Sequence, residues 1–295
     1  MAPNVMPIPQ DFTKVTLITG GSKGIGSGCA RVFAEAGARV FAEAGAPVVI
    51  CARGREVGEA LAAELNSQGP GECHFRQCDV SVPEDIYRVI DWTVDKYGRL
   101  DCLINNAGMH PPHRAIDEFS VEDFRQLLDL NLVSYFSASK YALPHLREVR
   151  GSIINMGSLV GTMGQQLATI YCATKGGISA FTKALAIEEA RHGVRVNAVL
   201  PGNILSNSRV EGVAQSENPE ELDKLVDSWQ WAGRSGSNEE AGYVCLFLAS
   251  DWARYVTGID LVISGGSELG YGVKAPWKIG LDLVKSQYPD PVNPL

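Results

Sequence analysis

The chain has 295 residues, of which 45% are hydrophobic and 20% charged, and its formal net charge is −8. These values are ordinary for a globular protein with ample core. The negative charge and the lack of a Lys/Arg run oppose binding to the phosphate backbone of nucleic acids. The sequence lacks both the pattern of a signal peptide and an apolar run of roughly eighteen residues, so it predicts a cytoplasmic protein that binds no membrane.

Seven cysteines form no C-x-x-C pair and are odd in number, which predicts reduced core residues rather than a disulfide framework. His110 and His113 lie three apart in HPPH, a spacing that could suggest metal binding. The two prolines between them oppose a helical ligand pair, and no further ligand cluster supports one. No metal is expected.

Short apolar runs at residues 15–19, 48–51, 100–105, 152–155, 194–199 and 260–263 alternate with segments of helical pattern. Such alternation predicts an α/β fold of the Rossmann type, with a doubly wound parallel sheet covered by helices on both faces. No linker divides the chain, so one domain is expected over residues 1–295. Residues 202–236 carry helical pieces without a strand, which predicts a mobile helical substrate lid, and a C-terminal tail is expected over about 267–295.

The first helix contains a tandem repeat, because residues 31–38 and 39–46 both read RVFAEAGA. An extra copy adds roughly 12 Å to the helix if it is helical, and it rotates the residues that follow by about 80° around the helix axis. We expect one copy to form the helix and the other to loop out or add a turn before the strand at 48–51. A recent duplication and a functional insertion both remain open, and no residue of the repeat suggests chemistry.

The segment TGGSKGIG at residues 19–26 follows a predicted strand and opens a helix, the context in which a glycine pattern indicates dinucleotide binding. Gly20 is expected to permit a tight turn, Gly24 to let the backbone approach a pyrophosphate, and Gly26 to allow close helix–sheet packing. A tight turn without a ligand is the alternative.

Two further strand ends carry candidate ligand contacts. Asp79 in CDV follows one strand and can accept a hydrogen bond from an adenine amino group, while Ala107 and Gly108 in NNAG leave room for a sugar. Because ligands of open α/β sheets lie beyond the carboxyl ends of the strands, these residues are expected beside the glycine turn.

Tyr171 and Lys175 are four residues apart and therefore share one helix face, with Ser158 upstream. A neighbouring cation favours phenolate, so Lys175 is expected to lower the Tyr171 pKa from about 10 towards neutrality, as general acid–base catalysis requires. A solvated helix face is the alternative for this pair in isolation.

Taken together, TGGSKGIG, CDV, NNAG, Asn131 in LDLNLVSYF, Ser158 in INMGSLVG, the Tyr171–Lys175 pair and Pro201-Gly202 closely resemble the short-chain dehydrogenase/reductase family, over residues 15 to about 266. Within it, segments such as NNAGMHPPH, INMGSLVGTMGQ and GGSELGYGVKA resemble a 17β-hydroxysteroid dehydrogenase branch that is also associated with L-fucose oxidation. The resemblance implies a homotetramer with a nicotinamide cofactor.

Site residues follow from this resemblance. The implied catalytic residues are Asn131, Ser158, Tyr171 and Lys175: Ser158 binds the reacting oxygen, Tyr171 exchanges its proton, Lys175 binds the nicotinamide ribose, and Asn131 holds a water of the proton relay. His110, Ser158, Gln165 and Asn203 are the implied substrate contacts, with a surface loop as the alternative for His110. The implied cofactor contacts are Gly20, Ser22, Lys23, Gly24, Ile25, Gly26, Arg53, Asp79, Val80, Asn106, Ala107, Gly108, Tyr171, Lys175, Pro201, Gly202, Ile204 and Ser206.

The sequence departs from NAD-using relatives at Ala52 and Arg53, where those relatives carry an acidic residue for the ribose 2′-hydroxyl. Arg53 can instead pair with a 2′-phosphate, which favours NADP, with NAD as the alternative. The predicted function is hydride transfer between this cofactor and a secondary alcohol or ketone, with a 17β-hydroxysteroid placed first. An L-fucose-type sugar dehydrogenase and a non-catalytic dinucleotide-binding scaffold are the alternatives.

Overall fold

The computed structural model describes residues 13–40, 46–68, 72–270 and 274–275. Seven strands form one sheet in the order β3-β2-β1-β4-β5-β6-β7, and every neighbouring pair is parallel. The predicted doubly wound α/β fold is therefore confirmed. The strands are β1 (Thr16–Thr19), β2 (Val48–Ala52), β3 (Cys73–Gln77), β4 (Cys102–Asn105), β5 (Ser152–Met156), β6 (Arg195–Pro201) and β7 (Asp260–Ile263).

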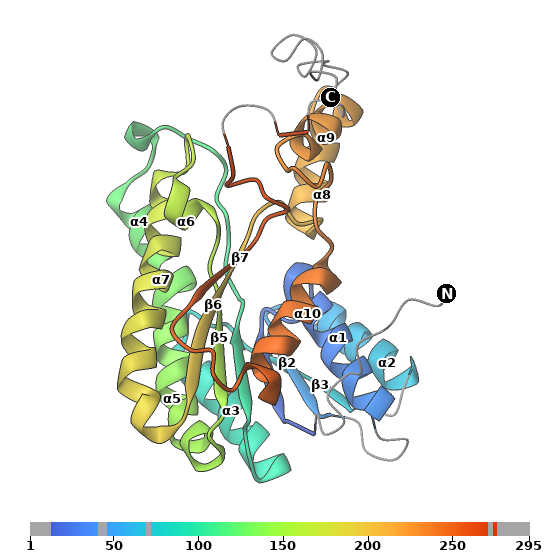
Figure 1. Cartoon of the computed structure of the whole chain (residues 1–295), viewed down its shortest axis with the longest axis vertical. Coiled ribbons are helices and arrows are strands. Elements are labelled where there is room, and N and C mark those ends of the chain that lie inside the picture. Colours follow the sequence, from blue (N-terminus) through green and yellow to red (C-terminus); the bar gives the residue numbers. More distant parts are fainter. Residues whose placement is uncertain (1–12, 41–45, 69–71, 271–273, 276–295) are drawn as a thin grey trace, which may run out of the picture.

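Side chains of successive strand residues point to opposite faces, and this alternation builds two cores. Ile18 and Ile104 pack on one face with residues of α1 (Gly24–Val40), α2 (Arg55–Gln68) and α10 (Asn238–Ala249). Leu17 and Leu103 pack on the other face with residues of α3 (Pro83–Tyr97), α5 (Ser134–Val149) and α7 (Thr169–Glu189). Figure 1 shows these two helical layers on either side of the sheet. Burial of both faces explains why the strands read as continuous apolar runs.

Shorter elements complete the described part of the chain. They are α4 (Val121–Leu128), α6 (Val160–Met163), α8 (Asn207–Ala214), α9 (Pro219–Asp227), the 3-10 turns Ile116–Glu118, Ala190–His192 and Asp251–Ala253, and a π-helical turn, η2 (Asp129–Val133). Strand β3 ends with half-exposed and exposed residues because it lies at the sheet edge, which is why its bounds were not visible as an apolar run.

The first copy of the RVFAEAGA repeat lies within α1, which extends to Val40. Residues 41–45 of the second copy lie outside the described residues, so the expected loop or extra turn stays a prediction. The strand after the repeat has the expected register, since Val48 pairs with Thr16 and Cys51 pairs with Thr19.

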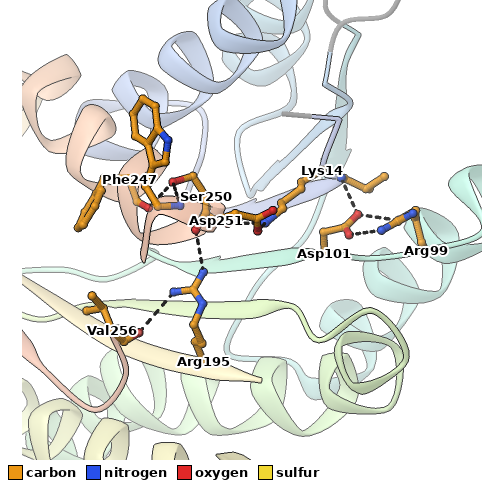
Figure 2. A network of polar contacts seen from close by, with 11 residues as sticks. Lys14, Arg99, Asp101, Arg195, Phe247, Ser250, Asp251 and Val256 are labelled. Atoms are coloured by element: carbon orange, nitrogen blue, oxygen red, sulfur yellow. Dashed lines mark hydrogen bonds and ion pairs between the residues drawn. The ribbon is translucent and has the colours of Figure 1, made fainter. Parts of the chain in front are cut away.

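A polar network fastens the amino ends of three strands (Figure 2). Before β4, the buried carboxylate of Asp101 accepts hydrogen bonds from the Val15 backbone N–H at 2.9 Å and from Arg99 Nε at 2.9 Å. Lys14 pairs with Asp251 at 2.7 Å, and Arg195, at the start of β6, donates to the Ser250 carbonyl at 3.3 Å. The candidate site residues lie at the carboxyl ends of the strands. This polar network lies at the opposite edge of the sheet.

All seven cysteines are free thiols, and all except the half-buried Cys172 are buried. Burial raises the pKa of Cys73 to about 12 and that of Cys102 to about 11, which keeps both protonated at neutral pH. The predicted core location is confirmed for the six buried cysteines, whereas their reduced state stays a prediction. Within the described ranges, no helix is both long and apolar enough to cross a membrane.

Candidate active site and dinucleotide-binding edge

The glycine turn between β1 and α1 has the backbone that only glycine adopts readily. Gly20 and Gly24 have positive φ angles of 64° and 54°. A Cβ at Gly26 would lie 2.3 Å from the Gly20 carbonyl oxygen, so this position admits no side chain. A Cβ at Gly24 would lie 3.5 Å from Ser206 Cβ, an ordinary contact distance, so this position lacks the crowding found at Gly26. The turn therefore fits a dinucleotide pyrophosphate at the N-terminus of α1.

Asn106 braces this turn from the end of β4. Its Nδ2 donates to the carbonyls of Thr19 and Gly20, at 3.0 and 3.2 Å. The Thr19 hydroxyl in turn accepts from the backbone N–H groups of Asn106 and Ala107, at 3.0 and 3.1 Å. The side-chain amide of Asn106 thus holds two strand ends together, a positioning role that the sequence-based interpretation as a direct cofactor contact did not include.

The ends of β2 and β3 bring Arg53 and Asp79 near each other. Asp79 Oδ1 accepts hydrogen bonds from the Ser81 hydroxyl at 2.7 Å and the Ser81 N–H at 3.0 Å. These bonds, with the charge of Arg53, lower the Asp79 pKa. Arg53 is exposed, and among the described residues no side-chain hydrogen bond or ion pair engages its guanidinium. Arg55 lies 3.6 Å from Glu59 of its own helix, and its Nη2 donates to Gln77 Oε1 of β3 at 3.3 Å.

Other sequence-predicted cofactor residues lie at the same carboxyl edge. Gly108 follows β4, and a Cβ there would be 3.1 Å from Asn131 Oδ1 and 3.7 Å from Lys175 Nζ. This close packing explains the small residue. The rest flank strand ends already described: Ser22, Lys23 and Ile25 in the glycine turn, Val80 after β3, and Pro201, Gly202, Ile204 and Ser206 at or after the end of β6.

Tyr171 and Lys175 come from the first turns of α7, and Ser158 follows β5. Lys175 is buried, with 4% of its surface exposed, and its Nζ donates to the Met156 carbonyl at 2.8 Å. The same Nζ lies 5.8 Å from the centre of the Tyr171 ring. Ser158 hydrogen-bonds Tyr171, which favours the phenolate. The three residues therefore meet, as the sequence predicted.

The expected lowering of the Tyr171 pKa by Lys175 is wrong for the protein alone. Burial raises the pKa of Tyr171 to about 12, against the opposing hydrogen bond from Ser158. Burial also lowers the pKa of Lys175 to about 7, so the ammonium is only partly populated at neutral pH. The physical reason is desolvation, which disfavours the charged form of both groups. The spacing of the two residues specifies their proximity but not their removal from water.

Asn131 lies fully buried in η2, a π-helical turn of the kind often found at functional sites. Its Oδ1 accepts from the Met109 N–H at 2.9 Å, and its Nδ2 donates to the Met109 carbonyl at 2.9 Å and to Thr174 Oγ1 at 3.2 Å. The carboxamide thus ties the loop after β4 to α7. The predicted binding of a relay water by Asn131 stays a prediction.

A cavity of about 390 Å³ opens beside Tyr171. The His110 ring lies 4.1 Å from the Tyr171 ring, centre to centre, and His110 Nε2 is 3.2 Å from Gln165 Oε1. Asn203 also lines the cavity, with its Nδ2 donating to Gln230 at 2.6 Å. All four predicted substrate contacts, Ser158 included, therefore line the same cavity. The lining residues are His110, Ser158, Leu159, Val160, Met163, Gly164, Gln165, Tyr171, Pro201, Gly202, Asn203, Trp229, Ser267 and Lys274.

The sequence-based interpretation did not name six side chains of this lining, Leu159, Val160, Met163, Trp229, Ser267 and Lys274. The last three are more than 50 positions from Tyr171 in the chain. His110 and His113 have rings 5.0 Å apart, and the described residues contain no group of three or more His, Cys, Asp or Glu arranged for a metal ion.

Residues 202–236 form the two helices α8 and α9, with only an isolated bridge between Ile204 and Gly236. Leu205 N donates to the Gly236 carbonyl at 2.8 Å, and Gly236 N donates to the Asn203 carbonyl at 2.9 Å, so the two ends of the segment lie side by side. Arg209 of α8 pairs with Asp223 of α9 at 2.7 Å. The helical content predicted for this segment is confirmed, whereas its mobility stays a prediction.

Comparison with known proteins supports the same interpretation. Residues 20–268 match a protein family described as enoyl-(acyl carrier protein) reductase. The chain is 45% identical to L-fucose dehydrogenase of Bos taurus, over 89% of this chain and 92% of the relative, and 33% identical to (+)-borneol dehydrogenase 2 of Salvia officinalis, over 90% and 92%. The crystal structure of Cj0485 dehydrogenase superposes with a TM-score of 0.77 at 29% identity, covering 88% of this chain and 98% of that one.

Proposed function

Because the chain belongs to the short-chain dehydrogenase/reductase family, we propose that Ser158, Tyr171 and Lys175 are its catalytic residues and that a sugar hydroxyl is oxidised in the cavity beside them. Family membership makes the protein an oxidoreductase that uses a nicotinamide cofactor. The observation that carries the proposal is the hydrogen-bonded Ser158–Tyr171 pair at the cavity wall, with Lys175 on the same helix.

A nicotinamide held by these residues would supply the hydride acceptor for oxidation of the alcohol and the hydride donor for the reverse reduction. Ser158 holds the reacting oxygen, and Tyr171 takes the hydroxyl proton in oxidation and donates it in reduction. Lys175 would hold the ribose, and the glycine turn at the N-terminus of α1 would hold the pyrophosphate. Because burial raises the Tyr171 pKa to about 12, the neutral phenol is ready to donate, and oxidation is expected to accelerate as pH rises above neutrality.

The substrate class is proposed from the relatives and the cavity together. Similarity to L-fucose dehydrogenases, at 41–45% identity in two of them, favours a sugar, which reverses the order expected from the sequence. The polar wall formed by His110, Gln165 and Asn203 supports this choice, because it offers partners to several hydroxyls. A 17β-hydroxysteroid is the second candidate, favoured by the apolar lining from Val160, Met163 and Trp229.

A substrate panel tests this choice. Turnover of L-fucose-type sugars and 17β-hydroxysteroids would be followed with NAD and with NADP. The proposal expects kcat/KM for a sugar to exceed that for the steroids by at least tenfold. The reverse order would establish the steroid candidate, and dinucleotide binding without turnover of any alcohol would support the non-catalytic scaffold.

We further propose NADP as the preferred cofactor. The exposed guanidinium of Arg53, with Ala52 in place of a carboxylate, supports it, because a charge-assisted hydrogen bond of about 1.5–3 kcal/mol corresponds to a ten- to hundredfold preference. Ala52→Asp is expected to shift the kcat/KM ratio towards NAD by repelling the 2′-phosphate. A wild-type protein that clearly prefers NAD would refute this assignment.

A homotetramer is proposed as well. Apolar side chains on the outer helices support it, since Phe136 of α5 is 52% exposed and Tyr243 of α10 is 54% exposed. Sedimentation equilibrium of the full chain measures the assembly directly, and a monomer at micromolar concentration would rule the proposal out.

A further inference from the structure

A buried glutamine from the far end of the segment 202–236 holds the side chain of Asn203. Asn203 follows β6, whereas Gln230 follows α9 and lies 27 positions later in the chain. Gln230 is 1% exposed, and its Oε1 accepts a hydrogen bond from Asn203 Nδ2 at 2.6 Å. Its Nε2 donates to the Val226 carbonyl of α9 at 2.9 Å. Both polar ends of the Gln230 amide therefore have a partner.

These two hydrogen bonds determine which way the Asn203 amide faces. A backbone carbonyl can only accept, so the end of the Gln230 amide at Val226 must be the NH2 group and the other end must be the oxygen. That oxygen can also only accept, so Asn203 must turn its own NH2 group towards it. Reversing either amide would bring two acceptors or two donors together, which is costly at a buried position. The Val226 carbonyl thus fixes the orientation of Asn203 through Gln230.

Asn203 consequently presents an acceptor to the cavity beside Tyr171. Asn203 lines this cavity, whereas Gln230 does not. Among the described residues no hydrogen bond engages Asn203 Oδ1, and this oxygen is not one of the enclosed side-chain atoms that lack a partner. Because the NH2 group is turned to Gln230, Oδ1 is the polar atom that Asn203 leaves for a ligand. A carbonyl oxygen can bind a hydroxyl, which donates, but not an ether oxygen or a fluorine, which do not.

We propose that Asn203 Oδ1 accepts a hydrogen bond from a substrate hydroxyl other than the one that is oxidised, and that Gln230 is the positioning residue that holds this acceptor in place. The site then selects alcohols with a second free hydroxyl, such as sugars and other polyols. This inference rests on the proposed function of the site. The second hydroxyl does not change charge during the reaction, so the hydrogen bond contributes about equally to the ground state and the transition state and acts mainly on KM.

The experiment compares L-fucose with its deoxyfluoro derivatives, in which fluorine replaces one non-reacting hydroxyl at a time with little change in size. In the wild type, kcat/KM for one derivative is expected to be lower than that for L-fucose by about tenfold or more, mainly through KM, because Asn203 Oδ1 is left without a donor. In Gln230→Met the Asn203 amide can reverse, so this ratio of kcat/KM values should fall at least about fivefold. The electron-withdrawing effect of fluorine is common to both proteins and cancels in the comparison.

Three further variants separate positioning from a general effect on folding. Gln230→Glu keeps an acceptor oxygen against Asn203 Nδ2 and should retain most of the ratio. Gln126→Met removes an exposed glutamine of α4 that does not line the cavity, and it should leave the ratio unchanged. Asn203→Leu removes the acceptor itself and should lower the ratio as Gln230→Met does, and it tests the hydrogen bond even where Gln230→Met does not fold.

A double variant tests whether Gln230 acts through Asn203. In the Asn203→Leu background, Gln230→Met should cause no further change in the ratio, because the acceptor that it positions is already gone. Melting temperature and dinucleotide affinity are measured for each variant, and both should stay close to the wild-type values in Gln230→Glu and Gln126→Met.

The outcomes separate this role from the function on which it rests. An unchanged ratio in Gln230→Met, or an equal loss on L-fucose and all derivatives that follows a loss of dinucleotide affinity, would overturn the role of Gln230 and leave the dehydrogenase assignment standing. If the wild type oxidises L-fucose and all derivatives within about threefold of one another, Asn203 accepts no substrate hydroxyl. If the wild type oxidises no sugar with either cofactor, the proposed function fails, and the role of Gln230 fails with it.

Discussion

Burial of Lys175 should make the stability of the cofactor-free protein depend on pH in an unusual direction. Its pKa is lowered by burial from 10.5 to about 7, whereas the unfolded chain keeps a value near the former. Between pH 7 and pH 10 the unfolded state therefore binds more protons than the native state, and the free energy of unfolding contributed by this group rises with pH. Below pH 7 both states are protonated and this dependence ends.

The magnitude follows from linkage. One proton of difference changes the free energy of unfolding by about 1.36 kcal/mol per pH unit. Because the native lysine is half protonated near pH 7, the gain between pH 7 and pH 9 is about 2 kcal/mol. Lys175→Met keeps an unbranched side chain that is one heavy atom shorter and cannot titrate, so this variant should lack the gain.

Urea unfolding of the cofactor-free wild type and of Lys175→Met at pH 7 and pH 9 tests the prediction. The two proteins must be compared with each other, because buried thiols also titrate. The raised pKa values of Cys73 and Cys102 stabilise the native state at lower pH, and that contribution is lost as pH rises above about 8.5. This loss is common to both proteins and cancels in their difference. If the two stability curves run parallel within about 0.5 kcal/mol, burial does not lower the Lys175 pKa as the structure implies.

Three further predictions address the site and the fold. Tyr171→Phe should reduce turnover by about 10²–10⁴-fold while dinucleotide binding stays nearly intact, and a variant with more than about a tenth of wild-type activity would remove Tyr171 from the mechanism. Gly26→Ala should weaken dinucleotide binding at least about tenfold in a fluorescence titration, because its Cβ would collide with the glycine turn. Gly212→Ala is the control, since the space around its Cβ is open, and it should bind the dinucleotide as the wild type does. Equal affinities of the two variants would show that the turn can shift. Asp101→Asn should lower the free energy of unfolding by about 1–3 kcal/mol, because it weakens the hydrogen bonds to Val15 and Arg99. Urea unfolding measures this loss, with the surface variant Asp95→Asn as the control. The prediction is contradicted if both variants are as stable as the wild type.

The local sequence pattern was sufficient to predict strands β1 and β4 and the glycine turn that follows the first of them. Apolar runs at residues 15–19 and 100–105 predicted strands because burial on both faces demands apolar side chains at every position, and the structure has β1 and β4 there. The positive φ at Gly20 and the crowding at Gly26 were also predictable, because glycine is the residue that such a turn requires. In each case the pattern that carries the prediction lies within a few residues along the chain.

Tertiary structure alone decided the electrostatics and the outline of the cavity. The i, i+4 spacing brings Tyr171 and Lys175 together, but their pKa values depend on how completely distant segments exclude water, and here desolvation is the largest cause of both shifts. Lys274 is about a hundred positions from Tyr171, so only the return of the chain across Ser228 brings it to the same wall. A sequence records which residues are neighbours along the chain, whereas the charge state of a side chain and the shape of a cavity depend on which residues become neighbours in space.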